Sequence, residues 1–189
     1  MKKLNKIIEF LICIEVIFLA TFFPYNIAFL IKDINLTLIN FPITLQVTSF
    51  IVLTFLFSGN LVIKAHITYL IIGLFFIPIF YGGGSLGYLL TPNFGYLLGI
   101  FPLVRIINTL NKKEKINIPE IFRTCLYSLI IMHFVGISYL SIQSIMFDKL
   151  SLIPYNISLF SLSKMPYEIL ALIPTVLIIK LINNFKIKI

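Results

Sequence analysis

Long apolar segments are the feature of this sequence that most constrains its fold. Polar residues separate six of them, and most approach the roughly 20 residues that a helix needs to cross a bilayer. The predicted spans are about 7–31, 43–58, 61–81, 86–110, 121–147 and 166–185. The second is short and the fifth is long, which tilt or partial immersion accommodates. The sequence therefore predicts an all-α integral membrane protein with six transmembrane helices.

Composition supports this class, because 59% of the residues are hydrophobic and 12% are charged. A soluble domain carries roughly 25% charged residues. We expect residues 1–189 to form a single six-helix membrane domain. The basic N-terminus resembles a signal peptide, but it runs on apolar to Ile31 without a small-residue cleavage site, which favours a retained first span. Cys13 and Cys125 lie inside predicted spans and are expected to be small buried hydrophobes.

Basic residues predict the orientation in the membrane. Twelve of the 15 lie on one side of the predicted spans, whereas Lys32, Lys149 and Lys164 lie on the other. Cytoplasmic loops carry the excess of Lys and Arg, so both termini of this multi-pass plasma-membrane protein are predicted to be cytoplasmic. The net charge of +8 is then a topology signal that also attracts anionic lipid. Nucleic-acid binding is not expected.

In this topology, residues that are unusual for a membrane helix gather at the outer face. They occur in four segments: FPITLQ (41–46), the glycine stretch with TPN (82–93), the Ser- and Gln-containing half of the fifth span (138–144), and SLSKMPYE (161–168). Irregular backbone and polar groups at membrane depth are tolerated where they line a cavity or are buried in protein. The pattern indicates a pocket open to the outside. The alternative is that outer loops are polar anyway and that Gly is common in membrane helices.

The segment Gly83-Gly84-Ser85-Leu86-Gly87 matches the G-x-S-x-G pattern of serine hydrolases, with His133 as a conceivable base. That pattern requires a strand–turn–helix elbow, whereas this serine follows a predicted span, and no acid is obviously placed to orient His133. We therefore expect no enzyme, and we expect His133 and His66 to be satisfied between helices. The sequence has no P-loop and no metal-ligand motif, so it predicts no cofactor, no metal and an external energy source.

Several ionisable residues fall within or beside the spans. Glu15 lies deep in the first span and is either functional or paired with a cation such as Lys64. Lys164 and Glu168 are four residues apart and share a face if the sixth span is helical there. They form either an interfacial ion pair or a charged pair at the pocket mouth, beside Tyr167.

Three elements carry a resemblance to a known family. The elements are Pro42-Ile43-Thr44-Leu45-Gln46, a Gly-rich outer loop, and Thr91-Pro92-x-x-Gly95-Tyr96-Leu97-x-Gly99-Ile100. Together they resemble the BioY family, the biotin-binding S component of energy-coupling factor (ECF) transporters, over about residues 40–140. The resemblance implies a BioY-like fold and capture of biotin from outside. It also implies partnership with an ECF coupling membrane subunit and two ATPases.

The sequence departs from this family pattern in two places. The family has an Asp followed three residues later by a Lys at the start of the last helix, where this chain has Lys164, Tyr167 and Glu168. The charges are swapped in order, or the ligand differs. The first helix of S components carries a small-x-x-x-small docking strip, of which only Cys13, Ala20 and Ala28 are present here, so the docking surface is atypical.

The predicted substrate-binding residues follow from the pocket and from the resemblance. They are Gln46, Gly83, Gly84, Ser85, Asn93, Lys164, Tyr167 and Glu168. Lys164 is expected to bind the ligand carboxylate, because the other outer lysines adjoin Asp33 and Asp148. Gln46 and Glu168 are the candidates for the ureido group. Three alternatives stay open: an S component for another small vitamin-like ligand, an intramembrane hydrolase that uses Ser85 and His133, and a structural membrane protein.

Overall fold

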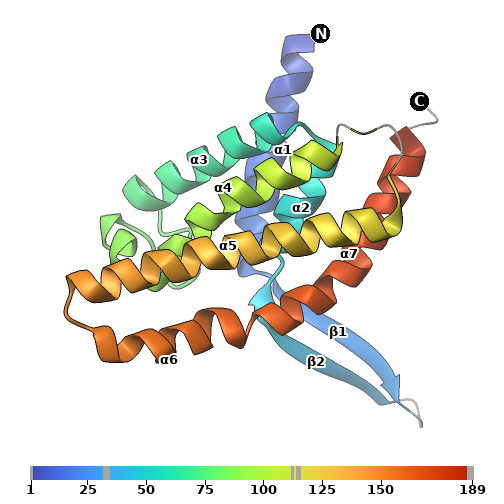
Figure 1. The fold of residues 1–189 in the computed structure, drawn as a ribbon. Coiled ribbons are helices and arrows are strands. Elements are labelled where there is room, and N and C mark those ends of the chain that lie inside the picture. Colours follow the sequence, from blue (N-terminus) through green and yellow to red (C-terminus); the bar gives the residue numbers. More distant parts are fainter. Residues whose placement is uncertain (1, 32–34, 112, 114–115, 187–189) are drawn as a thin grey trace.

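A computed structural model of the protein describes residues 2–31, 35–111, 113 and 116–186. Helices dominate the described chain (Figure 1). The elements in order are α1 (Lys2–Phe22), β1 (Pro24–Ile31), β2 (Asn35–Thr44), α2 (Gln46–Leu56), α3 (Gly59–Phe75), the 3-10 helix η1 (Leu86–Leu90), α4 (Pro92–Asn111), α5 (Ile118–Met146), the 3-10 helix η2 (Leu150–Leu152), α6 (Ile153–Ile157), the π-helix η3 (Ser158–Leu162) and α7 (Met165–Lys186).

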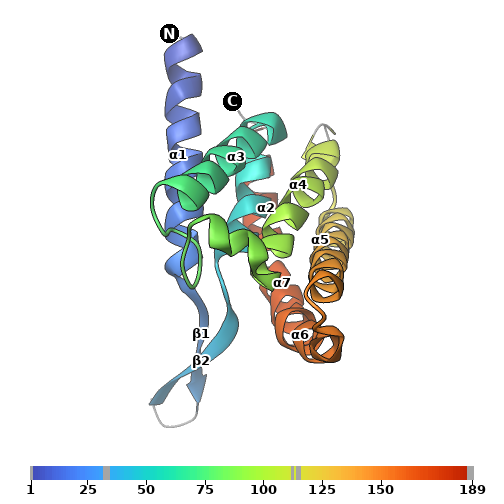
Figure 2. The same cartoon turned by 90° about the vertical axis from the view of Figure 1, so that its left-hand side faces the viewer.

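The first predicted span is wrong in its second half. Helix α1 ends at Phe22, and β1 and β2 form an antiparallel hairpin that extends away from the helices in both views (Figures 1 and 2). Strand β1 begins at Pro24, which has no backbone N–H to donate to a further helical hydrogen bond. A short apolar run does not distinguish strand from helix by its pattern, which explains the error. Lys32, predicted to be outside, lies beyond the described residues.

The remaining helices follow the prediction with shifted ends. Helix α2 is short, as expected, and α4 begins at Pro92, so the glycine stretch before it is a loop. Unpredicted turns of helix (η2, α6 and η3) connect α5 to α7. Within the described residues, three stretches are long and apolar enough to cross a membrane: Pro92–Leu110, Ile118–Met146 and Leu150–Asn184. Helices α2 and α3 are shorter apolar helices.

The helices pack around one apolar core, in which α4 lies along α5, α1 contacts α3, and α2 contacts both α4 and α7. Cys13 and Cys125 are free and fully buried in this core, as predicted. Glycines, among them Gly99 and Gly136, permit the close packing of α4 on α5. A Cβ on Gly99 would lie 2.5 Å from the Met132 carbonyl oxygen, and one on Gly136 would lie 2.5 Å from the Tyr96 ring. This packing brings Tyr96 beside His133.

Polar contacts tie the helices together at the end of the molecule where α3 begins. The Gly59 amide donates to Asn108 Oδ1 over 2.9 Å, and Lys180 Nζ donates to the Ile116 carbonyl over 3.0 Å. Lys113, between α4 and α5, forms an ion pair with Glu120 in the first turn of α5. The N-terminal end of α1 and the C-terminal end of α7 lie toward this side, opposite the hairpin (Figure 1).

Candidate functional site

A cavity of about 570 Å³ lies between the helices, where the hairpin joins the bundle. Aromatic and aliphatic side chains form most of its wall, with polar groups gathered at two places. Its lining residues are Phe22, Pro24, Pro42, Ile43, Thr44, Gln46, Val47, Tyr69, Phe80, Tyr81, Tyr88, Asn93, Tyr96, Leu97, Ile100, Met132, His133, Leu159, Phe160, Lys164 and Glu168. A mainly apolar cavity with a few convergent polar groups is the usual form of a small-molecule site.

Thr21, Gln46 and Tyr69 form the neutral cluster of the cavity. Gln46 Nε2 donates to Thr21 Oγ1 over 3.1 Å and to the Tyr69 hydroxyl over 3.3 Å. The Thr21 and Tyr69 hydroxyls lie 3.1 Å apart, and each also donates to a backbone carbonyl. These contacts join α1, α2 and α3. They fix the amide plane of Gln46 and engage its nitrogen, so its carbonyl oxygen is the group left for a ligand N–H.

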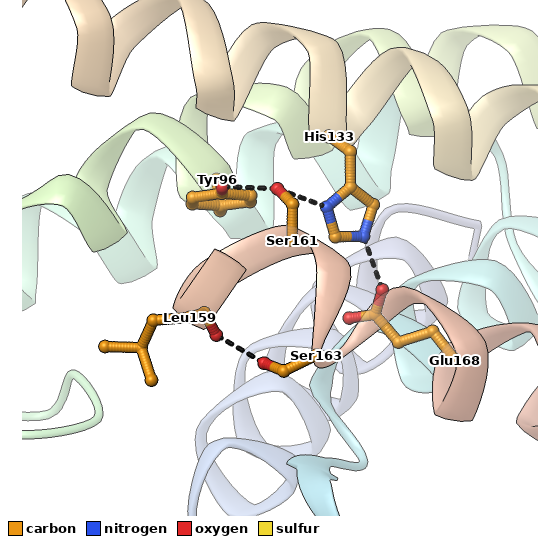
Figure 3. A network of polar contacts seen from close by, with 6 residues as sticks. All are labelled: Tyr96, His133, Leu159, Ser161, Ser163 and Glu168. Atoms are coloured by element: carbon orange, nitrogen blue, oxygen red, sulfur yellow. Dashed lines mark hydrogen bonds and ion pairs between the residues drawn. The ribbon is translucent and has the colours of Figure 1, made fainter. Parts of the chain in front are cut away.

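Tyr96, His133, Ser161 and Glu168 form the charged cluster (Figure 3). His133 Nε2 lies 2.6 Å from Glu168 Oε2, and His133 Nδ1 lies 3.1 Å from Ser161 Oγ. Ser161 Oγ in turn lies 2.6 Å from the Tyr96 hydroxyl. In one consistent assignment, each group donates to the next and the chain of hydrogen bonds ends on the carboxylate. The cluster joins α4, α5, η3 and α7.

Local structure explains how α7 and η3 present these groups. Pro166 occupies the first turn of α7, where a backbone N–H would have no helical acceptor. Glu168 also lies in this first turn, where the helix dipole favours a negative charge. The π-helix directs Ser161 inward, and Ser161 is 2% exposed, while Ser163 Oγ donates to the Leu159 carbonyl (Figure 3).

Lys164 lines the cavity one helical turn before Glu168. Its ammonium group lies 5.4 Å from the centre of the Phe160 ring. Among the described residues, Lys164 makes no direct ion pair, although the Glu168 carboxylate is close enough for its charge to act on it. The cavity therefore contains a cation that an acidic ligand can reach.

The glycine loop is a tight turn that supports the cavity wall. Gly82, Gly83 and Ser85 have positive φ values of 84°, 143° and 77°. The Ser85 amide donates to the Gly73 carbonyl over 2.9 Å, and a Cβ on Gly84 would lie 2.4 Å from Pro78 Cα. Gly83, Gly84 and Ser85 are not among the lining residues, contrary to their predicted position at the ligand.

The turn holds three aromatic side chains that do line the cavity: Phe80, Tyr81 and Tyr88. The Tyr88 hydroxyl donates to the Tyr81 carbonyl over 3.1 Å. Tyr88 lies in η1, before the candidate span of α4, and burial raises the pKa of its hydroxyl to about 12. It is therefore a neutral hydrogen-bond donor at physiological pH.

The structure brings half of the predicted site residues to the cavity. Gln46, Asn93, Lys164 and Glu168 line it. Tyr167 instead packs beside Ile43 and Ala171, outside the cavity lining. Four polar residues in the C-terminal half of α5 do not line the cavity either: Ser138, Ser141, Gln143 and Ser144.

Sequence reasoning missed the partners of the predicted residues. Thr21, Tyr69 and Ser161 belong to residue types that are common in membrane helices and do not by themselves indicate a site. They contact their partners across 23 to 65 positions of sequence. His133 offered a signal, as a titratable residue in an apolar span. It is satisfied between helices, as expected, and Glu168 is the acid that the sequence did not reveal.

Two other interpretations are corrected. The Ser85–His133 arrangement of a hydrolase is absent, because His133 contacts Ser161 and Glu168 while Ser85 is exposed on the glycine loop. Glu15 does not pair with Lys64 in the described structure. Both side chains are exposed on their helices.

A second hollow, of about 770 Å³, lies between α1, α2 and α7. It is larger than the first, but its wall is almost entirely apolar. The few polar side chains in it include Thr175, whose hydroxyl donates to the Ala171 carbonyl in its own helix. The smaller cavity is the candidate site, because it combines apolar contact area with convergent polar groups.

The fold and this cavity define a multi-pass helical membrane protein with room for a small ligand among its helices. The sequence matches the model of the BioY family over residues 4–186, and the chain belongs to that family. This membership confirms the resemblance noted in the sequence, the predicted fold class and the expectation that the protein is not an enzyme.

Two individual proteins are similar to this chain. A "Probable biotin transporter BioY" from Lysinibacillus sphaericus is 30% identical over 100 residues, which is 52% of this chain and 51% of that protein. The aligned part thus spans about half the length of the curated relative. The crystal structure of an S-component for biotin from an ECF-type ABC transporter has a TM-score of 0.68 and 20% identity. Its match covers 97% of this chain and 93% of the other. At that identity the likeness shows the fold.

Proposed function

We propose that this protein is the substrate-binding membrane subunit, or S component, of an ECF-type transporter for biotin. The observation that carries the proposal is Lys164, a part-buried cation in a ligand-sized, mostly apolar cavity that also contains a fixed amide. Biotin has a carboxylate, an apolar ring system and a ureido group. The cavity offers a complementary group for each of them.

Lys164 is the proposed partner of the ligand carboxylate. A charge-assisted hydrogen bond of this kind is worth roughly 1.5–3 kcal/mol, and more where water is excluded. Glu168, one turn along α7, has acceptor oxygens near this cation, but it is hydrogen-bonded to His133, which leaves Lys164 for the ligand. We therefore assign the carboxylate end of the ligand to Lys164.

Gln46 is the proposed partner of the ureido group, with Asn93 as a second amide in the cavity wall. Its carbonyl oxygen accepts a ureido N–H, since its nitrogen is bonded to Thr21 and Tyr69. Aromatic residues between the two ends supply contact for the ring system. Glu168, the other residue predicted for the ureido group, lies closer along α7 to the carboxylate end.

We also propose that the chain forms one membrane domain that works with an ECF coupling subunit and ATPases. The absence of a P-loop in the sequence supports an external energy source. The small residues of α1 are poorly placed for the usual docking strip: Cys13 and Ala20 are 0% and 5% exposed, within the core. Leu11, Phe18 and Phe22 are exposed on this helix instead.

The proposed orientation places both termini in the cytoplasm and the cavity mouth outside. Cysteines introduced at Lys113 and Ser85, both exposed, should be labelled by an impermeant reagent from opposite sides. The native Cys13 and Cys125 are fully buried and should give little background. Labelling of both positions from the outside would contradict the orientation.

The test of the proposed function is a Lys164→Ala variant of the detergent-purified protein. Biotin and its methyl ester are titrated separately, because the ester lacks the negative charge. We expect the variant to bind biotin about tenfold to a hundredfold more weakly, as the loss of a charged hydrogen bond requires. The ester should bind the wild type poorly and lose little further. Lys149→Ala, which removes an exposed lysine outside the cavity, is the matched control.

Unchanged affinity of Lys164→Ala for both acid and ester would contradict the proposed role of Lys164. A thermal-shift screen that includes dethiobiotin, thiamine and riboflavin separates the remaining alternatives. Saturable binding of one of these in preference to biotin would indicate an S component for another vitamin. No saturable ligand at all would favour a structural membrane protein.

A further inference from the structure

Lys164 and Glu168 are spaced to neutralise each other. The Glu168 amide donates to the Lys164 carbonyl over 3.0 Å, so the two residues are one turn apart on the same side of the chain. Oppositely charged side chains at this spacing commonly pair. In the structure the Glu168 charge acts on Lys164, but the two form no direct ion pair: Glu168 Oε2 lies 2.6 Å from His133 Nε2, and the Lys164 ammonium lies over the Phe160 ring.

His133 is built into the wall so that it can hold Glu168 in this position. Its side chain is 3% exposed, and its other nitrogen lies 3.1 Å from Ser161 Oγ. The ring also contacts Tyr96 edge to face, with 5.6 Å between centroids. Two hydrogen bonds and an aromatic contact therefore fix the orientation of the imidazole before any ligand arrives.

From this geometry we propose that His133 is a positioning residue that keeps Glu168 away from Lys164 and so preserves the site's preference for anionic ligands. The inference rests on the proposed function, in which Lys164 binds the ligand carboxylate. Without the imidazole, Glu168 turns toward Lys164 along α7 and neutralises it. An acidic ligand then has to displace an internal carboxylate, whereas a neutral ligand does not.

The quantity that reports this role is the acid preference, defined as the Kd of the methyl ester divided by the Kd of biotin. A general loss of packing would weaken the binding of biotin and of its methyl ester equally, so this ratio would stay unchanged. In the wild type we expect a ratio of about 10 to 100, as one charged hydrogen bond gives. His133→Leu, which has no donor for Glu168, should reduce the ratio at least about fivefold.

Two further variants identify the cause. His133→Gln retains an N–H donor for Glu168 and should keep most of the acid preference. The double variant His133→Leu/Glu168→Gln removes the competing carboxylate and should restore the preference that His133→Leu loses. If His133→Leu fails to fold, Ser161→Ala removes the group that orients the ring, and it should lower the ratio in the same direction.

The proposal is overturned if the folded His133→Leu variant, or Ser161→Ala in its place, keeps the wild-type ratio. It is also overturned if Glu168→Gln fails to restore the ratio in the His133→Leu background. Failure of the proposed function looks different. In that case the wild type shows no acid preference, or Lys164→Ala retains it.

Discussion

The neutral and charged clusters of the cavity perform comparable tasks with different chemistry. The neutral cluster joins α1, α2 and α3 through hydroxyls and one amide, and its outlying bonds end on backbone carbonyls. The charged cluster joins α4, α5, η3 and α7 and ends on a carboxylate. Both clusters connect several elements and contribute groups to the cavity wall.

This difference in chemistry predicts how substitutions in each cluster affect stability and ligand binding. A neutral hydrogen bond contributes about 0.5–1.5 kcal/mol, and its loss is largely local. Removing the donor that binds a buried carboxylate leaves that group without its hydrogen bond and costs roughly 1–3 kcal/mol or more unless another group takes its place. Lys164 is such a group for Glu168. Changes in the charged cluster should therefore alter selectivity, whereas changes around the neutral cluster should alter affinity for all ligands alike.

Among substitutions around the neutral cluster, Gly84→Ala is expected to have the largest effect. The added Cβ would lie 2.4 Å from Pro78 Cα, and such overpacking costs typically 1–3 kcal/mol. We expect the displaced loop to move residue 79, whose carbonyl accepts a hydrogen bond from the Tyr69 hydroxyl. We expect a lower melting temperature, together with equal weakening of biotin and its ester.

Gly87→Ala is the matched control in the same loop, because its Cβ would meet nothing closer than Ser85 Oγ at 3.6 Å. It should resemble the wild type in melting temperature and in affinity. If Gly84→Ala weakens binding with no loss of stability, the loop contacts the ligand directly, as the sequence analysis predicted. In that case the glycine loop would itself be part of the ligand-binding site.

A smaller effect is expected from Gln46→Leu, which removes the amide but keeps a similar volume. The lost hydrogen bond should weaken binding about twofold to tenfold. Because the amide is uncharged, biotin and its methyl ester should be affected equally, so the acid preference stays at the wild-type value. Isothermal titration of both ligands checks this. A selective loss of the acid would place the carboxylate at Gln46 and reverse the assigned ligand orientation.

The sequence was sufficient to single out residues of the cavity wall that carry their own chemical signal. Lys164 and Glu168 were singled out because charges are rare beside a membrane span, and Gln46 because it ends the unusual FPITLQ segment. All three line the cavity, and their roles in ligand binding stay predictions. The helical class followed from the apolar runs. These inferences depend on residue type and local spacing, which a single sequence displays directly.

The rest depends on contacts between distant segments. Nothing local tells that Ser161 meets both Tyr96 and His133, since the relevant turn is a π-helix in a segment expected to be loop. The glycines of residues 82–84 were correctly noted as conformationally special. Their predicted contact with the ligand has no support from the cavity lining, because freedom at positive φ serves a tight turn as well as it serves ligand approach. The hairpin was missed because its apolar strands resemble a helix end in composition.

The residues of the charged cluster lie far apart in the sequence, and this separation has a consequence for biosynthesis. His133 lies 28 residues before Ser161 and 35 before Glu168, so its partners leave the ribosome after it does. Helix α5 therefore enters the membrane with an imidazole that has neither partner. The cavity wall is completed only when α7 docks, which makes ligand binding a readout of full-length synthesis and of insertion of the last helix.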